Sequence, residues 1–135
     1  MTISIVIPSY QQAQYLNQAI DSVLNQTVKA HEIIVVDDGS QDNSLALAQA
    51  YEELGVRVIS QVNKGLPSAR NAGIMNATGD YILPLDSDDI LLPSAVEKIT
   101  EIAEKTKADV ISPSFKCFGL AQNEIILMEN PTAED

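Results

Sequence analysis

Apolar residues recur along the chain in two patterns: short β-branched runs, typical of buried strands, and longer stretches in which they repeat at helical spacing. The runs predict strands at residues 3–7, 32–36, 56–60 and 81–85. The repeating stretches predict helices at residues 12–26, 43–54 and 66–77. Strands that alternate with helices indicate an α/β fold, with a mostly parallel sheet and helices on both of its faces.

The pattern continues beyond the fourth predicted strand. Pro93 suits the first turn of a fourth helix. Its inward face is expected to carry Val96, Ile99, Ile102 and Ala103. Two further strand candidates cover residues 110–112 and 124–128.

Length and composition add limits to this picture. The 135 residues contain no linker-like stretch or internal repeat, so residues 1–135 are expected to form one domain with a frayed tail at 129–135. Nineteen acids against eight Lys and Arg residues give a net charge of -11, which argues against nucleic acid or an anionic membrane as the main partner. The single cysteine, Cys117, is expected to be a small apolar core residue in a reducing compartment.

The chain starts without the basic flank and long apolar stretch of a signal peptide. No apolar run approaches the ~18 residues that a membrane span requires. We therefore expect a cytoplasmic protein with no membrane span in this chain, and peripheral membrane association of a full-length protein stays open.

Polar residues follow each predicted strand, at the edge where open parallel sheets bind ligands. Pro8-Ser9-Tyr10 follow the first strand, and Asn63-Lys64-Gly65 follow the third. Acids dominate the other two ends, as Asp37-Asp38-Gly39-Ser40 after the second strand and Asp86-Ser87-Asp88-Asp89 after the fourth. An acidic protein with such clusters needs a cation if it is to bind an anion.

Asp86 and Asp88 form an Asp-x-Asp pattern. Residues two apart on an extended segment point the same way, about 7 Å from each other, so we expect Ser87 and Asp89 to face elsewhere. Two carboxylates about 4 Å apart repel by roughly 4 kcal/mol at an effective dielectric constant of about 20. A hard divalent ion such as Mg²⁺ or Mn²⁺ relieves this repulsion and keeps open positions for phosphate oxygens.

Phosphate binding by a glycine-rich loop is not expected. The chain has neither Gly-x-Gly-x-x-Gly after its first strand nor a Walker loop. The remaining candidates are the metal, the side chain of Arg70 and, more weakly, Lys64.

Four motifs in register resemble the nucleotide-binding half of family-2 glycosyltransferases, whose fold is called GT-A. The motifs are Ile5-Val6-Ile7-Pro8-Ser9-Tyr10, Val35-Val36-Asp37-Asp38-Gly39-Ser40, Asn63-Lys64-Gly65 with Ala69-Arg70-Asn71-Ala72-Gly73, and Leu85-Asp86-Ser87-Asp88-Asp89 with Pro93. They cover nearly the whole chain in the family's order and spacing. The resemblance implies a Rossmann-like GT-A fold that is truncated after its donor-binding half.

The resemblance also implies a base pocket. Pro8, Ser9 and Tyr10 would line it, with Tyr10 stacked on a pyrimidine. Asp38 would accept the imide N–H of uracil or thymine. A carboxylate only accepts hydrogen bonds, and cytosine has no donor at that ring position, so this contact favours a UDP-linked donor.

By the same resemblance, Asp88 would coordinate a Mn²⁺ or Mg²⁺ ion that bridges the two phosphates. Asp86 would contact the ribose or a metal-bound water, which makes it a second candidate for the metal site. Arg70 would brace the diphosphate or its flanking loop.

The implied activity is that of a metal-dependent, inverting glycosyltransferase. It would transfer a sugar from a nucleotide diphosphate sugar to a carbohydrate or lipid-linked acceptor hydroxyl. The general base is expected after Asp135, in an acceptor-binding half, so we expect this chain to bind donor with little transfer. The alternative is a non-catalytic nucleotide-binding or protein-interaction module of the same fold.

Structural roles compete with these assignments at several positions. Gly39 suits a turn with positive φ, and Ser40 or Asp42 suits the cap of the following helix. Asp37 is either a ligand or part of that turn. Asp89 is expected to cap the fourth helix or to support its neighbours rather than bind directly.

Overall fold

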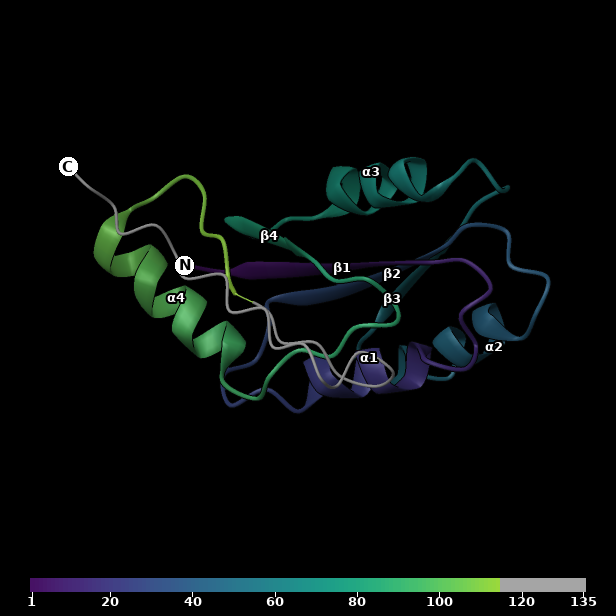
Figure 1. Cartoon of the computed structure of the whole chain (residues 1–135), viewed down its shortest axis with the longest axis horizontal. Helices are drawn as coiled ribbons and strands as arrows, with labels where there is room; N and C mark the ends of the chain where they lie inside the picture. Colours follow the sequence, from purple (N-terminus) through teal and green to yellow (C-terminus); the bar gives the residue numbers. More distant parts are fainter. Residues whose placement is uncertain (115–135) are drawn as a thin grey trace.

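The computed structural model describes residues 1–114. Its elements are β1 (Ile3–Ser9), α1 (Leu16–Leu24), β2 (Glu32–Asp37), α2 (Ser44–Gln49), the 3₁₀ helix η1 (Glu52–Leu54), β3 (Arg57–Ser60), α3 (Leu66–Asn76), β4 (Tyr81–Pro84) and α4 (Ala95–Thr106). The strands form one parallel sheet in the order β3-β2-β1-β4 (Figure 1). The predicted α/β architecture is confirmed for this part of the chain.

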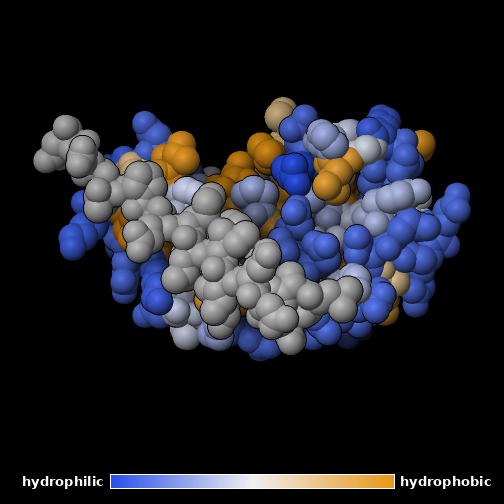
Figure 2. Space-filling model, in the orientation of Figure 1, coloured by the Kyte–Doolittle hydropathy of each residue, from blue (hydrophilic) through white to orange (hydrophobic). Residues whose placement is uncertain are grey.

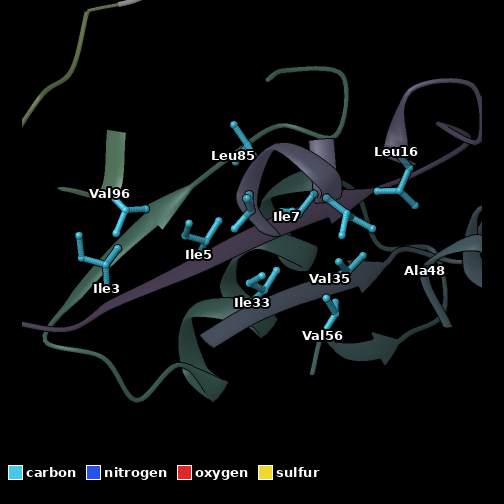
Figure 3. Close-up of a cluster of buried hydrophobic side chains, with 12 residues drawn as sticks. Ile3, Ile5, Ile7, Leu16, Ile33, Val35, Ala48, Val56, Leu85 and Val96 are labelled. Atoms are coloured by element: carbon cyan, nitrogen blue, oxygen red, sulfur yellow. The ribbon is translucent and has the colours of Figure 1, made fainter. Parts of the chain in front are cut away.

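Both faces of the sheet are covered by helices. In Figure 1, α3 lies on one side of the strands and α1 and α2 on the other. The larger apolar core lies between the sheet and α1, where Ile5, Ile7 and Leu16 are fully buried (Figure 3). Coverage on both faces explains why β1 and β2 are near-continuous apolar runs, and each such side chain stabilises the fold by about 1.5 to 3 kcal/mol.

The core on the opposite face is smaller and depends on close approach of α3. Ile34 and Val36 of β2 pack there against Ala69. Gly73 faces β1 so closely that a Cβ at this position would overlap Cγ1 of Val6. A residue without a side chain is therefore required for α3 to lie directly on the sheet.

The first two helices are shorter than predicted. The amides of Gln12 and Ala13 bond to Ser44 Oγ at 3.1 Å and Asp42 Oδ2 at 3.2 Å, so residues 12–15 form a loop held by its neighbour, and α1 begins only at Leu16. The predicted helix at residues 43–54 divides into α2 and η1. Tertiary contacts thus overrule the helical periodicity at both positions.

The fourth helix also differs from its prediction. It begins at Ala95, so Pro93 lies before it rather than in its first turn. Val96 and Ala103 are buried and Ile99 packs against the core, but Ile102 is 45% exposed, so its predicted inward position is wrong.

Two strand predictions have different outcomes. Residues 110–112 form no strand within the described range 1–114, and Val110 is 83% exposed. The strand candidate at 124–128, the core position of Cys117 and the frayed tail lie outside the described residues. The single-domain assignment of residues 1–135 stays a prediction. Among residues 1–114, no helix has the length and apolarity that crossing a membrane demands.

Candidate functional site

A cavity of about 480 Å³ opens at the carboxyl ends of the strands. Its lining comes from every strand-end segment of the sheet and includes Pro8, Tyr10, Gln12, Asp38, Asn63, Gly65, Asp86, Ser87 and Asp88. Parallel strands end at one edge of a sheet, which is why segments far apart in sequence meet here. The structure therefore brings together five of the predicted site residues: Pro8, Tyr10, Asp38, Asp86 and Asp88.

A second hollow, of about 590 Å³, lies along the outer edge of β4 and lacks these strand-end acids. Its lining includes Ile82, Ile99 and Val110. Figure 2 shows apolar side chains exposed between α3 and α4, in the region of this edge. The predicted site residues Tyr10, Asp38, Asp86 and Asp88 converge at the smaller cavity, so we assign the chemistry to that cavity.

The segment after β4 gathers three carboxylates. Asp86, Asp88 and Asp89 are exposed, and one oxygen from each lies within 4.8 Å of the others. Leu85, which precedes Asp86, and Ser87, which lies between Asp86 and Asp88, are both buried. The predicted alternation therefore holds for Asp86 and Asp88. Carboxylate oxygens at this spacing match the preference of Mg²⁺ and Mn²⁺ for hard oxygen ligands.

Asp89 belongs to this group, contrary to the prediction that it faces elsewhere. The segment turns rather than staying extended, because the amide of Asp89 donates to the carbonyl of Asp86 at 3.0 Å. The cap role is also wrong, since α4 begins at Ala95 and has no side-chain cap. Burial is the main cause that raises the pKa of Asp89, and the negative charges of Asp88 and Asp86 raise it further.

Arg70 reaches this group from α3. Its Nη2 lies 3.0 Å from Oδ1 of Asp86, and both side chains are partly exposed. Its Nε is buried and has no hydrogen-bond partner. The guanidinium thus lies beside the acids where an anion would need positive charge, and its predicted contact with a diphosphate stays a prediction.

Asp38 is buried beneath the cavity and binds the loop between β3 and α3. Its Oδ1 accepts from Gln61 Nε2 at 2.8 Å and the Lys64 amide at 2.9 Å. Its Oδ2 accepts from Asn63 Nδ2 at 3.2 Å and the Gly65 amide at 2.9 Å. Burial alone would raise the pKa of Asp38, but the hydrogen bonds from Gln61, Lys64 and Gly65 lower it below its ordinary value.

These four donors use the usual acceptor positions of a carboxylate. The predicted bond from a base N–H to Asp38 therefore requires one donor to move, and that bond stays a prediction. Asn63 also lines the cavity beside Asp38; the sequence places it after the third strand and in one of the four motifs but predicts no role for it.

The turn after β2 is fixed by its glycine and by Asp37. Gly39 has φ 71°, and a Cβ there would lie 2.7 Å from the amide nitrogen of Asn63, so the predicted turn role is confirmed. Asp37 is 2% exposed and accepts from the Ser40 amide at 3.1 Å, while its Oδ1 has no partner. Asp42 Oδ1, rather than Ser40, accepts from the first amide of α2, that of Ser44, at 3.0 Å.

Tyr10 lies at the mouth of the cavity and is 42% exposed, which leaves its ring free for stacking. The next residue, Gln11, has φ 54°, a conformation that non-glycine residues rarely adopt. Its Oε1 accepts from the amides of Gln41 at 2.6 Å and Asp42 at 3.1 Å. Ser9, in contrast, is fully buried with an unpartnered hydroxyl and does not line the cavity.

Comparison with known proteins identifies the family to which these features belong. Residues 4–134 match the family model described as glycosyl transferase family 2, and the chain belongs to that family. It is 40% identical over 115 residues to the glycosyltransferase EpsJ of Bacillus subtilis, covering 84% of this chain and 33% of that protein. It is 41% identical over 112 residues to the glycosyltransferase GlyG of Streptococcus pneumoniae, covering 81% of this chain and 37% of that protein.

A solved structure supports the fold. The crystal structure of S. aureus TarS (residues 1–349) in complex with UDP-GlcNAc aligns with a TM-score of 0.75 and 27% identity, over 81% of this chain and 33% of the TarS chain. The expected GT-A fold, represented by its amino-terminal part, is thereby confirmed. The chain spans about a third of the length of these relatives.

Proposed function

We propose that this chain is the donor-binding region of a metal-dependent, inverting glycosyltransferase whose donor is UDP-linked. The observation that carries the proposal is the convergence, in one cavity, of an exposed aromatic ring and a group of three carboxylates. A nucleotide diphosphate sugar has a flat base at one end and two phosphates at the other. The ring of Tyr10 would stack on the base, and the acids would bind the phosphates through a cation.

The metal would be held by Asp88 and Asp86, with Asp89 as a third candidate because its carboxylate lies in the same group. When bound, Mn²⁺ or Mg²⁺ supplies positive charge that favours departure of the diphosphate. Arg70, paired with Asp86, is the side chain of α3 best situated to add further positive charge to the phosphates.

On the base side, Pro8 and Tyr10 would form the platform, and Ser9 would contribute only through its backbone because its side chain is buried. Asp38 would select uracil either by accepting its imide N–H or by holding Asn63 and Gly65 against it. The TarS structure with UDP-GlcNAc supports a donor of this class by similarity.

Transfer needs more than donor binding. In an inverting displacement the acceptor oxygen attacks the anomeric carbon from the face opposite the diphosphate, and a base must take its proton. We infer that residues after Asp135 supply this base and the binding site for a carbohydrate or lipid-linked acceptor. EpsJ and GlyG are about three times the length of the matched region, which agrees with this inference.

The alternative is a non-catalytic nucleotide-binding or protein-interaction module. It is favoured by one observation, that the carboxylates of Asp38 and Asp86 are already engaged by donors of the chain itself. A module that binds no nucleotide sugar would show neither UDP binding nor any effect of Mn²⁺ on it.

The test is calorimetric titration of the chain with UDP, in the presence and absence of Mn²⁺. Asp88→Asn should remove most of the Mn²⁺-dependent affinity, because it takes one charge from the cation site, while the fold stays intact. Asp109→Asn is the matched control, since Asp109 is exposed and lies outside the cavity. An Asp88→Asn variant that binds UDP with Mn²⁺ as tightly as the parent would contradict the metal assignment, and a parent that binds no UDP would favour the alternative.

A further inference from the structure

The acidic segment, residues 86–90, is attached to the rest of the molecule at both ends. At its start, the amide of Leu85 donates to the carbonyl of Val6 in β1 at 2.9 Å. At its end, the amide of Leu91 donates to Ser22 Oγ in α1 at 3.0 Å. Between these attachments the three carboxylates crowd together, and their mutual repulsion favours a more open segment.

Gln26 supplies a second attachment at the end of this segment. The residue is 4% exposed, follows α1, and makes three hydrogen bonds with its side chain. Its Nε2 donates to the carbonyl of Leu92 at 2.7 Å and to that of Ser22 at 3.0 Å. Its Oε1 accepts from the amide of Val96, in the first turn of α4, at 3.0 Å.

Each polar atom of this buried amide is therefore used. One of its bonds also satisfies an amide in the first turn of α4, a helix that has no side-chain cap of its own at its start. An adjacent backbone bond reinforces the attachment, because the amide of Thr27 donates to the carbonyl of Pro93 at 2.9 Å. The two residues Gln26 and Thr27, just after α1, thus fix the position at which the chain leaves the acidic segment and enters α4.

We propose that Gln26, supported by Ser22, is a positioning residue: it holds the acidic segment so that its three carboxylates stay close enough together to bind one cation. The inference rests on the proposed function. Gln26 is hydrogen-bonded to none of the three acids. It acts by fixing Leu92 and Val96 while Ser22 fixes Leu91, and together these bonds limit how far the three carboxylates spread. Tyr10 and its platform are held separately, by Gln11 and the segment after β2.

This separation gives the experiment its readout. In the full chain, Gln26→Met keeps the length and burial of the side chain and removes its hydrogen bonds. We expect the gain in UDP affinity on adding Mn²⁺ to fall about tenfold, the usual scale for residues that orient metal ligands. The affinity for uridine, which lacks phosphates, should stay unchanged.

Two further variants complete the set. Ser22→Ala removes the bond from the Leu91 amide and the hydroxyl's own bond to the carbonyl of Ala19, within α1. It keeps all three bonds of Gln26 and should give a smaller loss in the same direction, which covers the case in which Gln26→Met does not fold. Gln18→Met makes the same exchange at an exposed position of α1 and should change neither measurement.

Amide hydrogen exchange separates failure of this inference from failure of the proposed function. Faster exchange at Leu91 and Val96 in Gln26→Met, together with the selective loss of the Mn²⁺ effect, supports the inference. Unchanged exchange at both amides, an unchanged Mn²⁺ effect, or an equal loss of uridine affinity overturns it. A parent chain that binds no UDP with Mn²⁺ overturns the proposed function and, with it, the cation role of the segment.

Discussion

The acids after β2 and the acids after β4 have the same chemistry and opposite surroundings. Asp38 is 1% exposed, and its carboxylate receives four hydrogen bonds from residues 61–65. Asp88 is exposed, and its neighbours are two further carboxylates. The carboxylate of Asp38 therefore holds the loop between β3 and α3 in place, whereas the carboxylate of Asp88 is accessible from the solvent. The donors around an acid thus decide whether its charge is used within the fold or stays accessible.

The largest expected effect comes from removing the engaged acid. Asp38→Ala leaves two backbone amides and two side-chain amides beneath the cavity without their acceptor, and should lower the free energy of unfolding by about 3 kcal/mol. Asp88→Ala is the matched change in the other segment, and should leave stability unchanged or slightly raised because it relieves repulsion. Denaturant unfolding of both variants measures the contrast, and equal losses would refute it.

A smaller effect is expected in the pH dependence of stability, with opposite signs for the two segments. The lowered pKa of Asp38 means that its stabilising contribution is present above the unfolded-state value and is lost as the pH falls through the folded-state value. The raised pKa of Asp89 means that its ionised form opposes folding, and this penalty decreases as the pH falls through its folded-state value.

Unfolding curves between about pH 3 and pH 7 test this prediction, since unperturbed Asp titrates near pH 3.9. Asp38→Asn should make the chain less stable at neutral pH and less sensitive to acid. Asp89→Asn should make it more stable at neutral pH. Parallel pH profiles for parent and variants would show that neither carboxylate carries the assigned role.

The smallest effect on stability is expected for the ion pair between Arg70 and Asp86, the first acid after β4. Arg70 and Asp86 are 34% and 51% exposed at their side chains, so Arg70→Met should change the free energy of unfolding by no more than about 0.5 kcal/mol. If Arg70 contacts the diphosphate, its loss should nevertheless weaken UDP binding about tenfold, as a charged hydrogen bond warrants. Arg70→Lys keeps the charge without the planar fork, and uridine titration gives the phosphate-free control.

The strands and α3 could be predicted because their signals are local. The β-branched runs predict β1 and β2, although each strand extends past its predicted end, β1 through Pro8 to Ser9 and β2 to Asp37. The strand ends then indicate where a ligand binds. The gathering of Asp86 and Asp88 with Tyr10 in one cavity follows from the same topology.

What the sequence did not reveal depends on contacts between distant residues. The donors to Asp38 lie 23 to 27 positions away, and the partners of Gln26 in α4 and before it lie 66 to 70 positions away. The prediction for Asp89 is wrong because the segment forms a turn there and is not extended. The predicted start of α1 is wrong because the side chains of Ser44 and Asp42 accept hydrogen bonds from the amides of Gln12 and Ala13.

Gly73 gives the close packing of α3 a consequence for its neighbour Arg70. Any side chain at position 73 would act as a spacer against Val6 and raise the helix from the sheet. The guanidinium one turn earlier would be raised with it, away from its 3.0 Å contact with Asp86. The height of a positive charge above the acidic end of the cavity is thus set by the absence of a side chain on the face of the helix that meets the sheet.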